Sequence, residues 1–131
     1  MRVIHNLQAA LVHWVYTQEE WKAYRRWEQS RRSPLHSVLF RLFRQQIVSV
    51  PEITITGQKV WIDNISQVFM DQQRQLKRVN IREMGSMNIL VIIYACMEQN
   101  RERVSEIRVP VPTGKLKEAV IVQESLAGYT V

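Results

Sequence analysis

Residues 88–96 read Asn88-Ile-Leu-Val-Ile-Ile-Tyr-Ala-Cys96, the most hydrophobic run of the chain. Side chains of this kind, mostly β-branched, aliphatic or aromatic, favour a β-strand. The run is too short to cross a bilayer as a helix, which needs about 18 uncharged apolar residues. It therefore predicts a strand that is buried in the core of the domain.

Further strand-like segments lie on both sides of this run. Residues 53–63 predict a hairpin, because isoleucine alternates with threonine before a Gly-Gln turn. Residues 76–83 also alternate and end at a Met-Gly-Ser turn. Residues 107–111 predict another strand, which should lie at a sheet edge or run out of the sheet, because Pro110 and Pro112 donate no ladder hydrogen bond.

A helix is predicted at the C-terminal end, over residues 115–126, with Gly128 as its stop. An apolar stripe lays this helix on the sheet. Residues 67–75 are polar, and residues 99–103 are predicted to form a solvent-facing loop. The predicted inner face of the helix consists of Leu116, Ala119, Val120, Gln123 and Leu126 or Ala127.

The first 50 residues predict a strand followed by helices. Residues 9–16 are β-branched and aromatic, which suits a strand. Thr17 and Glu20 predict a capping box at the start of a helix, and Ser33-Pro34 ends that helix. Helical spacing of apolar residues predicts a second helix over residues 35–46. One side of the first helix carries Trp21, Tyr24, Trp27 and Glu28.

The length and composition fit a single domain. A chain of 131 residues can bury one core of its own, and its 46% hydrophobic residues are typical of globular proteins. We predict an α+β fold: a bent antiparallel, barrel-like sheet with an N-terminal helical segment and a C-terminal capping helix. Residues 1–50 would supply a strand and the helical segment, and residues 51–131 the sheet with its terminal helix.

The formal net charge of +6 raises the affinity for polyanions, although it also suits a plain solvated basic surface. The single cysteine, Cys96, cannot form an intrachain disulfide, which fits a reducing compartment. The N-terminus lacks the apolar core of a signal peptide, and no segment is long and apolar enough to span a membrane. The sequence therefore predicts a cytoplasmic protein without a transmembrane segment.

Motifs for catalysis or metal binding are not found in the sequence. His5, His13 and His36 share no metal-ligand spacing, and only four glycines are present, with no Gly-rich phosphate loop. His13 is expected to lie in the core or at an interface, and Cys96 to be a buried structural thiol. We predict that the protein is not an enzyme and holds no cofactor or metal.

Arginines gather in residues 21–44, interleaved with Trp and Tyr, a combination typical of single-stranded nucleic-acid binders. Helical spacing separates the aromatic residues from most of the arginines. This separation instead indicates a helix with one face in the core and one cationic face in solvent. Whether Trp21, Trp27 and Trp61 are buried stays open. The candidate anion- or partner-binding residues are Arg25, Arg26, Arg31, Arg32, Arg41 and Arg44. A smaller basic cluster, Arg74, Lys77, Arg78 and Arg82, either extends this patch or pairs with Glu102 and Glu106.

The strand-like pieces at 53–62, 74–83, 88–96 and 107–112 are followed by a helix that begins Gly114-Lys-Leu-Lys-Glu-Ala. This order resembles the bacterial pleckstrin-homology-like domains. The stretch Tyr16-Thr-Gln-Glu-Glu-Trp21 is similar to a helix start in membrane-tethered members, whose hydrophobic spans are replaced here by residues 35–50. The resemblance implies a strongly bent antiparallel sheet, plugged by the C-terminal helix, in a binding or scaffolding module. It implies no particular ligand residues.

These observations predict a non-enzymatic interaction or scaffolding module that binds a protein or an anionic surface. The alternative is a nucleic-acid-binding protein that uses the arginine-rich helical face. A third hypothesis is a homo-oligomer joined through the 107–111 edge or through exposed Trp side chains.

Overall fold

A computed structural model describes residues 8–30 and 50–130 of the chain. All strand pairs are antiparallel, and they form a four-stranded sheet of order β1-β2-β3-β4 and a three-stranded sheet of order β5-β6-β7. The elements are β1 (Ala10–Trp14), α1 (Gln18–Ser30), β2 (Ile53–Thr56), β3 (Lys59–Ile62), β4 (Ile65–Val68), β5 (Arg74–Met84), β6 (Met87–Glu98), β7 (Arg101–Val111) and α3 (Leu116–Ala127).

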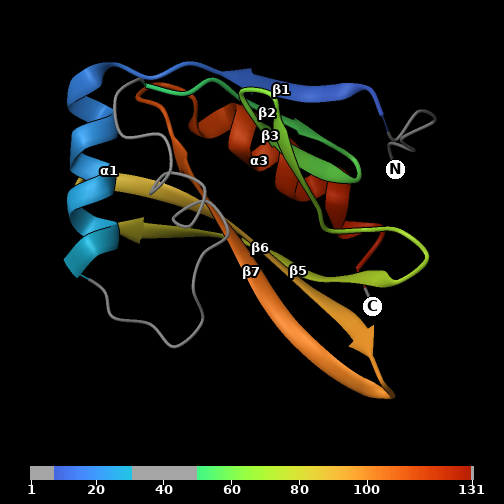
Figure 1. Cartoon of the computed structure of the whole chain (residues 1–131). Coiled ribbons are helices and arrows are strands. Elements are labelled where there is room, and N and C mark those ends of the chain that lie inside the picture. The colour runs from blue at the N-terminus through green and yellow to red at the C-terminus, as the bar shows by residue number, and fades with distance from the viewer. Residues whose placement is uncertain (1–7, 31–49, 131) are drawn as a thin grey trace.

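The predicted α+β class is confirmed, because the described residues form two helices and two antiparallel sheets (Figure 1). Over residues 8–30 and 50–130 the framework consists of two sheets and is not closed into a barrel. In Figure 1, α3 lies between the two sheets and α1 lies at one end of the molecule. The far end of the β6–β7 hairpin projects from the rest of the protein.

The hydrophobic run at 88–96 forms most of β6, the central strand of the three-stranded sheet. Side chains on both of its faces are buried, which explains why the run is apolar without alternation. Leu90 pairs with Val109 on one face, and Val91 pairs with Arg108 on the other. Because Arg108 contacts Glu28, the Val91 face is turned toward α1.

The start of α1 follows the predicted capping box. The Thr17 hydroxyl accepts from the backbone N–H of Glu20 at 3.1 Å, and the Glu20 carboxylate accepts from the N–H of Thr17 at 2.8 Å. These reciprocal bonds satisfy two main-chain donors that an open helix end would leave unpaired. They fix the point at which the chain leaves β1 and turns into α1.

The C-terminal helix packs against β5 and β1. Its Gln123 Nε2 donates to the backbone oxygen of Val79 at 3.1 Å, and Trp14 Nε1 donates to Glu118 Oε1 at 3.1 Å. The predicted inner face of this helix was wrong in part. Leu116 and Val120 were expected on the inner face but are exposed, and Val122 is buried instead. Two helical stripes of similar hydrophobicity exist, and only the positions of the strands decide between them. The buried residues are Ala119, Val122, Ser125 and Leu126.

A polar segment and a predicted loop are strands in part. The polar region that begins near Gln67 overlaps β4 (Ile65–Val68), which pairs with β3. The expected loop at 99–103 is reduced to Gln99 and Asn100, which have φ values of 50° and 64°. Positive φ at both positions suits the tight turns that join antiparallel strands. The chain therefore continues β7 from Arg101 with its charged side chains in solvent.

Candidate functional site

Part of the predicted cationic face lies on α1. There, Lys22 and Arg26 are exposed and Arg25 is half-buried. The remaining predicted arginines, at positions 31, 32, 41 and 44, lie outside the described residues, as does the predicted helix over 35–46. In the sequence, residues 31–49 hold four arginines and no acidic residue. That segment thus accounts for most of the net charge of +6.

The aromatic side of α1 belongs to the core. Trp21 is 5% exposed and Tyr24 is 1% exposed, whereas Trp27 is half-buried. Ring centroids lie 5.5 Å apart for Tyr16 and Trp21 and 5.3 Å apart for Trp21 and Tyr24, in tilted arrangements. The interpretation of this stripe as a core face is confirmed for Trp21. Trp61, which lies on β3 and not on α1, is half-buried.

A buried group of charges joins α1 to β7. Arg108 Nη1 lies 2.7 Å from Glu28 Oε1, and the same guanidinium pairs with Glu106 through Nη2. The side chains of Arg108 and Glu28 are only 4% and 3% exposed. Burial alone would lower the pKa of Arg108, but the bonds and charges of the two glutamates raise it above its ordinary value. Arg108 is therefore a fixed cation between two acidic side chains.

The tyrosines of the α1 region cover part of the β7 edge. The Tyr16 hydroxyl donates to the backbone oxygen of Pro110 at 2.6 Å, and the Tyr24 hydroxyl lies 3.4 Å from that of Arg108. Because main-chain groups alternate in direction along a strand, these two oxygens point to the same side, away from β6. The prediction that residues 107–111 lie at a sheet edge is confirmed, since β7 is the outer strand. This part of the edge is covered by tyrosine hydroxyls, and self-association through it remains a prediction.

A pocket of about 270 Å³ is lined by residues from the start of α1, the β5–β6 turn and the link between β7 and α3. Most of its lining is apolar, and among the described residues that line it Glu20 is the one with a charge. The sequence pointed to Glu20 only as a capping residue. The lining residues are Tyr16, Glu20, Ala23, Ser86, Met87, Asn88, Pro110, Val111, Pro112, Thr113, Gly114 and Leu116.

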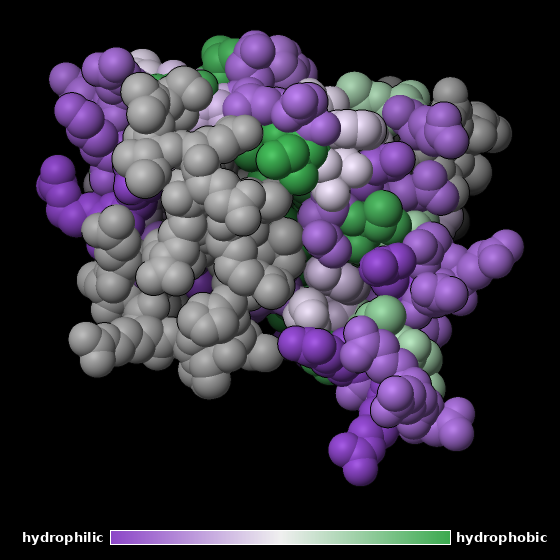
Figure 2. Space-filling view, in the orientation of Figure 1, coloured by the Kyte–Doolittle hydropathy of each residue, from purple (hydrophilic) through white to green (hydrophobic). Residues whose placement is uncertain are grey.

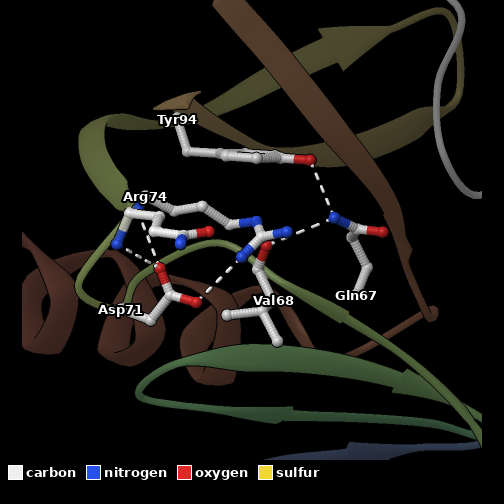
Figure 3. A network of polar contacts seen from close by, with 6 residues as sticks. Gln67, Val68, Asp71, Arg74 and Tyr94 are labelled. Atoms are coloured by element: carbon white, nitrogen blue, oxygen red, sulfur yellow. Dashed lines mark hydrogen bonds and ion pairs between the residues drawn. The ribbon is translucent and has the colours of Figure 1, made fainter. Parts of the chain in front are cut away.

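Two residues of the second basic cluster, Arg74 and Lys77, have acidic partners. Arg74 Nη1 lies 2.8 Å from Asp71 Oδ2, and Figure 3 shows the Arg74 side chain between this carboxylate and the Tyr94 ring. Gln67 Nε2 donates to the Tyr94 hydroxyl at 2.9 Å and so ties β4 to β6. Lys77 pairs with Glu102 at 3.1 Å, which agrees with the predicted alternative that this cluster pairs with Glu102 and Glu106. The hydrogen bond between Gln67 and Tyr94, rather than the basic cluster itself, thus joins the two sheets.

The remaining residues singled out by sequence have modest roles. His13 was expected in the core or at an interface, but it is exposed and lies 3.4 Å from Glu52. Cys96 was expected to be buried and is half-buried. Within the two described ranges, no group of three or more His, Cys, Asp or Glu side chains is placed to hold a metal ion.

Comparison of the chain with protein-family models, curated proteins and solved structures finds no match. Over the part of the chain that the structure describes, no helix has the length and hydrophobicity required to cross a membrane. Inferences about function therefore rest on the residues and their arrangement.

Proposed function

We propose that the protein is a non-enzymatic interaction module, resembling a bacterial pleckstrin-homology-like domain, that binds a protein or an anionic surface through its cationic side. The observation that supports this proposal is that α1 has a buried aromatic side and a separate cationic side. Its aromatic side chains fill the core, while Lys22, Arg25 and Arg26 lie on the partly or fully exposed side. A cationic surface of this kind attracts anionic partners through long-range electrostatics.

The distribution of charge supports the same reading. Glu28 of α1 is already neutralised by its ion pair with buried Arg108. It therefore does little to offset the charges of Arg25 and Arg26. Hydrophilic residues also dominate the described surface in Figure 2, including the projecting hairpin. A hydrophilic, cationic surface favours electrostatic recognition over burial of an apolar partner.

Vesicle co-sedimentation tests the proposal. We expect binding to vesicles that contain phosphatidylserine, weaker binding as salt rises from about 50 to about 200 mM, and none to phosphatidylcholine alone. Polyglutamate serves as the probe for an acidic protein surface. The double variant Arg25→Gln/Arg26→Gln should weaken binding about thirtyfold, since each of the two basic residues near an anionic surface contributes about 1 kcal/mol.

The matched control is Arg101→Gln/Arg103→Gln, which removes the same charge from exposed positions on β7. A control that weakens binding as much as the α1 variant would show that only net charge matters. Absence of binding to both the vesicles and polyglutamate at low salt would refute the proposal.

Nucleic-acid binding through phosphate contacts stays an alternative, but the two aromatic side chains best suited to stack on bases are not accessible. Trp21 and Tyr24 are buried, so their faces are not open to bases. Binding would have to depend on phosphate contacts, with a steep salt dependence and little preference for single strands. Mobility shifts with single- and double-stranded probes of equal length separate this alternative from the surface-binding proposal.

A further inference from the structure

The pocket at the start of α1 combines one carboxylate with apolar walls. Glu20 is the one charged residue that the described part of the chain contributes to its lining, and the hydrocarbon surface comes from Ala23, Met87, Val111, Pro112 and Leu116. Its volume of about 270 Å³ lies at the small end of ligand pockets. A pocket of this size suits a single side chain or a small molecule.

The Glu20 carboxylate is held in place by the main chain. One oxygen accepts from the N–H of Thr17 at 2.8 Å, and the other accepts from the N–H of Thr113 at 2.6 Å. Burial alone would raise the pKa of Glu20, but hydrogen bonds from Thr113 and Thr17 lower it overall. Each oxygen of an ionised carboxylate has a second lone pair, so Glu20 can accept further hydrogen bonds.

Two more polar groups line the same pocket. The side chains of Ser86 and Asn88 form no hydrogen bond with any described residue, although Asn88 is half-buried. A hydroxyl and an amide oxygen are further acceptors for a donor-rich ligand. The Tyr16 hydroxyl, in contrast, is committed to the backbone oxygen of Pro110.

We propose that this pocket binds an organic cation, an ammonium or guanidinium group on a short hydrocarbon stem. The charged end would lie against Glu20, with the stem along the apolar walls, the way Lys and Arg side chains bury their methylenes. An anion would be repelled by Glu20, and a neutral apolar ligand would cover an ionised carboxylate without pairing it. The cation comes either from a Lys or Arg side chain of a partner protein or from a free small amine.

The net charge of +6 opposes a cationic ligand at long range, so the attraction must be local. Lys115, which follows the lining residue Gly114, is already paired with Glu118 at 3.2 Å. Its ammonium group is thus held by another carboxylate. The pocket binds a charge opposite to that of the partners proposed for the arginine surface, and neither proposal depends on the other.

The test is a titration followed by amide NMR shifts of the full chain. We expect saturable shifts of Ala23, Ser86 and Thr113 with butylammonium and with a capped lysine peptide, at about millimolar concentration for ligands with so few atoms. Butyrate and butanol, matched in size, should leave these amides unmoved. Tighter binding of the peptide by about tenfold or more identifies a protein side chain as the source, and equal binding identifies a free amine.

Two variants separate the site from the fold. Glu20→Gln removes the charge and should weaken butylammonium binding about tenfold or more, as expected for a charge-assisted contact. Ala23→Leu fills the pocket, keeps the carboxylate and a good helix-forming residue, and should abolish binding. If Glu20→Gln fails to fold, the Ala23→Leu variant decides.

Glu124→Gln is the control, because it removes an exposed charge of α3 outside the pocket lining. Unchanged cation binding in Ala23→Leu would refute the proposal. So would equal shifts with butyrate. Since vesicle binding does not involve Glu20 or Ala23, failure here leaves the surface-binding proposal to its own test.

Discussion

Arg108 and Glu28 are separated by 80 positions in the sequence and meet at 2.7 Å in the interior, between α1 and β7. The Arg108 guanidinium also pairs with Glu106 and lies 5.9 Å from the centre of the Trp27 ring. Its Nε is buried and has no hydrogen-bond partner among the described residues. The contact is the main polar link that fixes the second half of α1 to the three-stranded sheet.

Replacement of Glu28 by Gln should destabilise the fold by about 3 kcal/mol, because loss of one partner leaves a buried charge incompletely compensated. The remaining pair with Glu106 keeps the loss at the lower end of the range measured for broken buried pairs. Urea unfolding at neutral pH measures the effect. The control Glu124→Gln, on the exposed side of α3, should change stability by less than about 0.5 kcal/mol. Equal effects of the two substitutions would mean that the buried pair contributes little.

The tyrosines that cover the β7 edge predict a loss of stability at alkaline pH. Burial is the main cause that raises the pKa of both Tyr16 and Tyr24, and nearby glutamates raise it further. A phenol with a raised pKa in the folded state contributes its full stability below the ordinary value of about 10, and this stability is lost as the pH rises above it.

Tyr16→Phe should cost about 1 kcal/mol at neutral pH, the net value of one hydrogen bond, and should make the alkaline loss less steep. Thermal unfolding between about pH 8 and pH 11 measures both effects. Tyr16→Leu is a useful comparison, because it also removes the ring contact with Trp21. A Phe variant with an unchanged alkaline profile would show that the Tyr16 hydroxyl does not titrate with unfolding.

Local patterns predicted much of the fold. The capping box at Thr17, the turn before residue 59 and the apolar run at 88–96 depend on neighbouring residues, and the structure has each of them in place. The two proline positions near 110 correctly indicated an edge strand. Signals of this kind are readable because the interactions span only a few residues.

Contacts between distant segments could not be predicted in the same way. Glu28 was placed on the apolar side of α1, a sign that it needs a partner, but nothing local identifies Arg108 as that partner. The pocket also depends on three distant segments, and its carboxylate was already explained by helix capping. The inner face of α3 was misplaced for the same reason, since the strands decide which stripe is buried.

The Glu20 carboxylate predicts a loss of stability in acid. Its pKa is lowered in the folded state, so its contribution is present above the ordinary value of about 4.3 and is lost as the pH falls through the lower folded value. The difference in unfolding free energy between the wild type and Glu20→Gln should therefore be larger at pH 7 than near about pH 3.

Thr17→Ala tests the same helix start without a change of charge. It should cost about 1 kcal/mol, the usual value of an N-cap side chain, at both pH values. Urea unfolding of the two variants at both pH values is the measurement. A Glu20→Gln difference that stays constant with pH would contradict the assignment of the lowered pKa to this carboxylate.

The four tryptophans differ in exposure, which predicts their response to quenchers. Trp14 and Trp21 are buried, whereas Trp27 and Trp61 are half-buried. The Lys59 ammonium lies 5.2 Å from the centre of the Trp61 ring, so iodide, an anion, should collect near this indole. We expect Trp61→Phe to remove a large share of the iodide quenching and Trp21→Phe to leave it almost unchanged.

Acrylamide, which is neutral, provides the control for charge. If Lys59 attracts iodide, Lys59→Gln should reduce quenching of Trp61 by iodide and leave quenching by acrylamide unchanged. Equal loss of iodide quenching in Trp21→Phe and Trp61→Phe would place Trp21 at the surface. An exposed Trp21 beside Arg25 would restore the stacking face that nucleic-acid binding requires, and it would remove the division of α1 into a core side and a cationic side on which the surface-binding proposal depends.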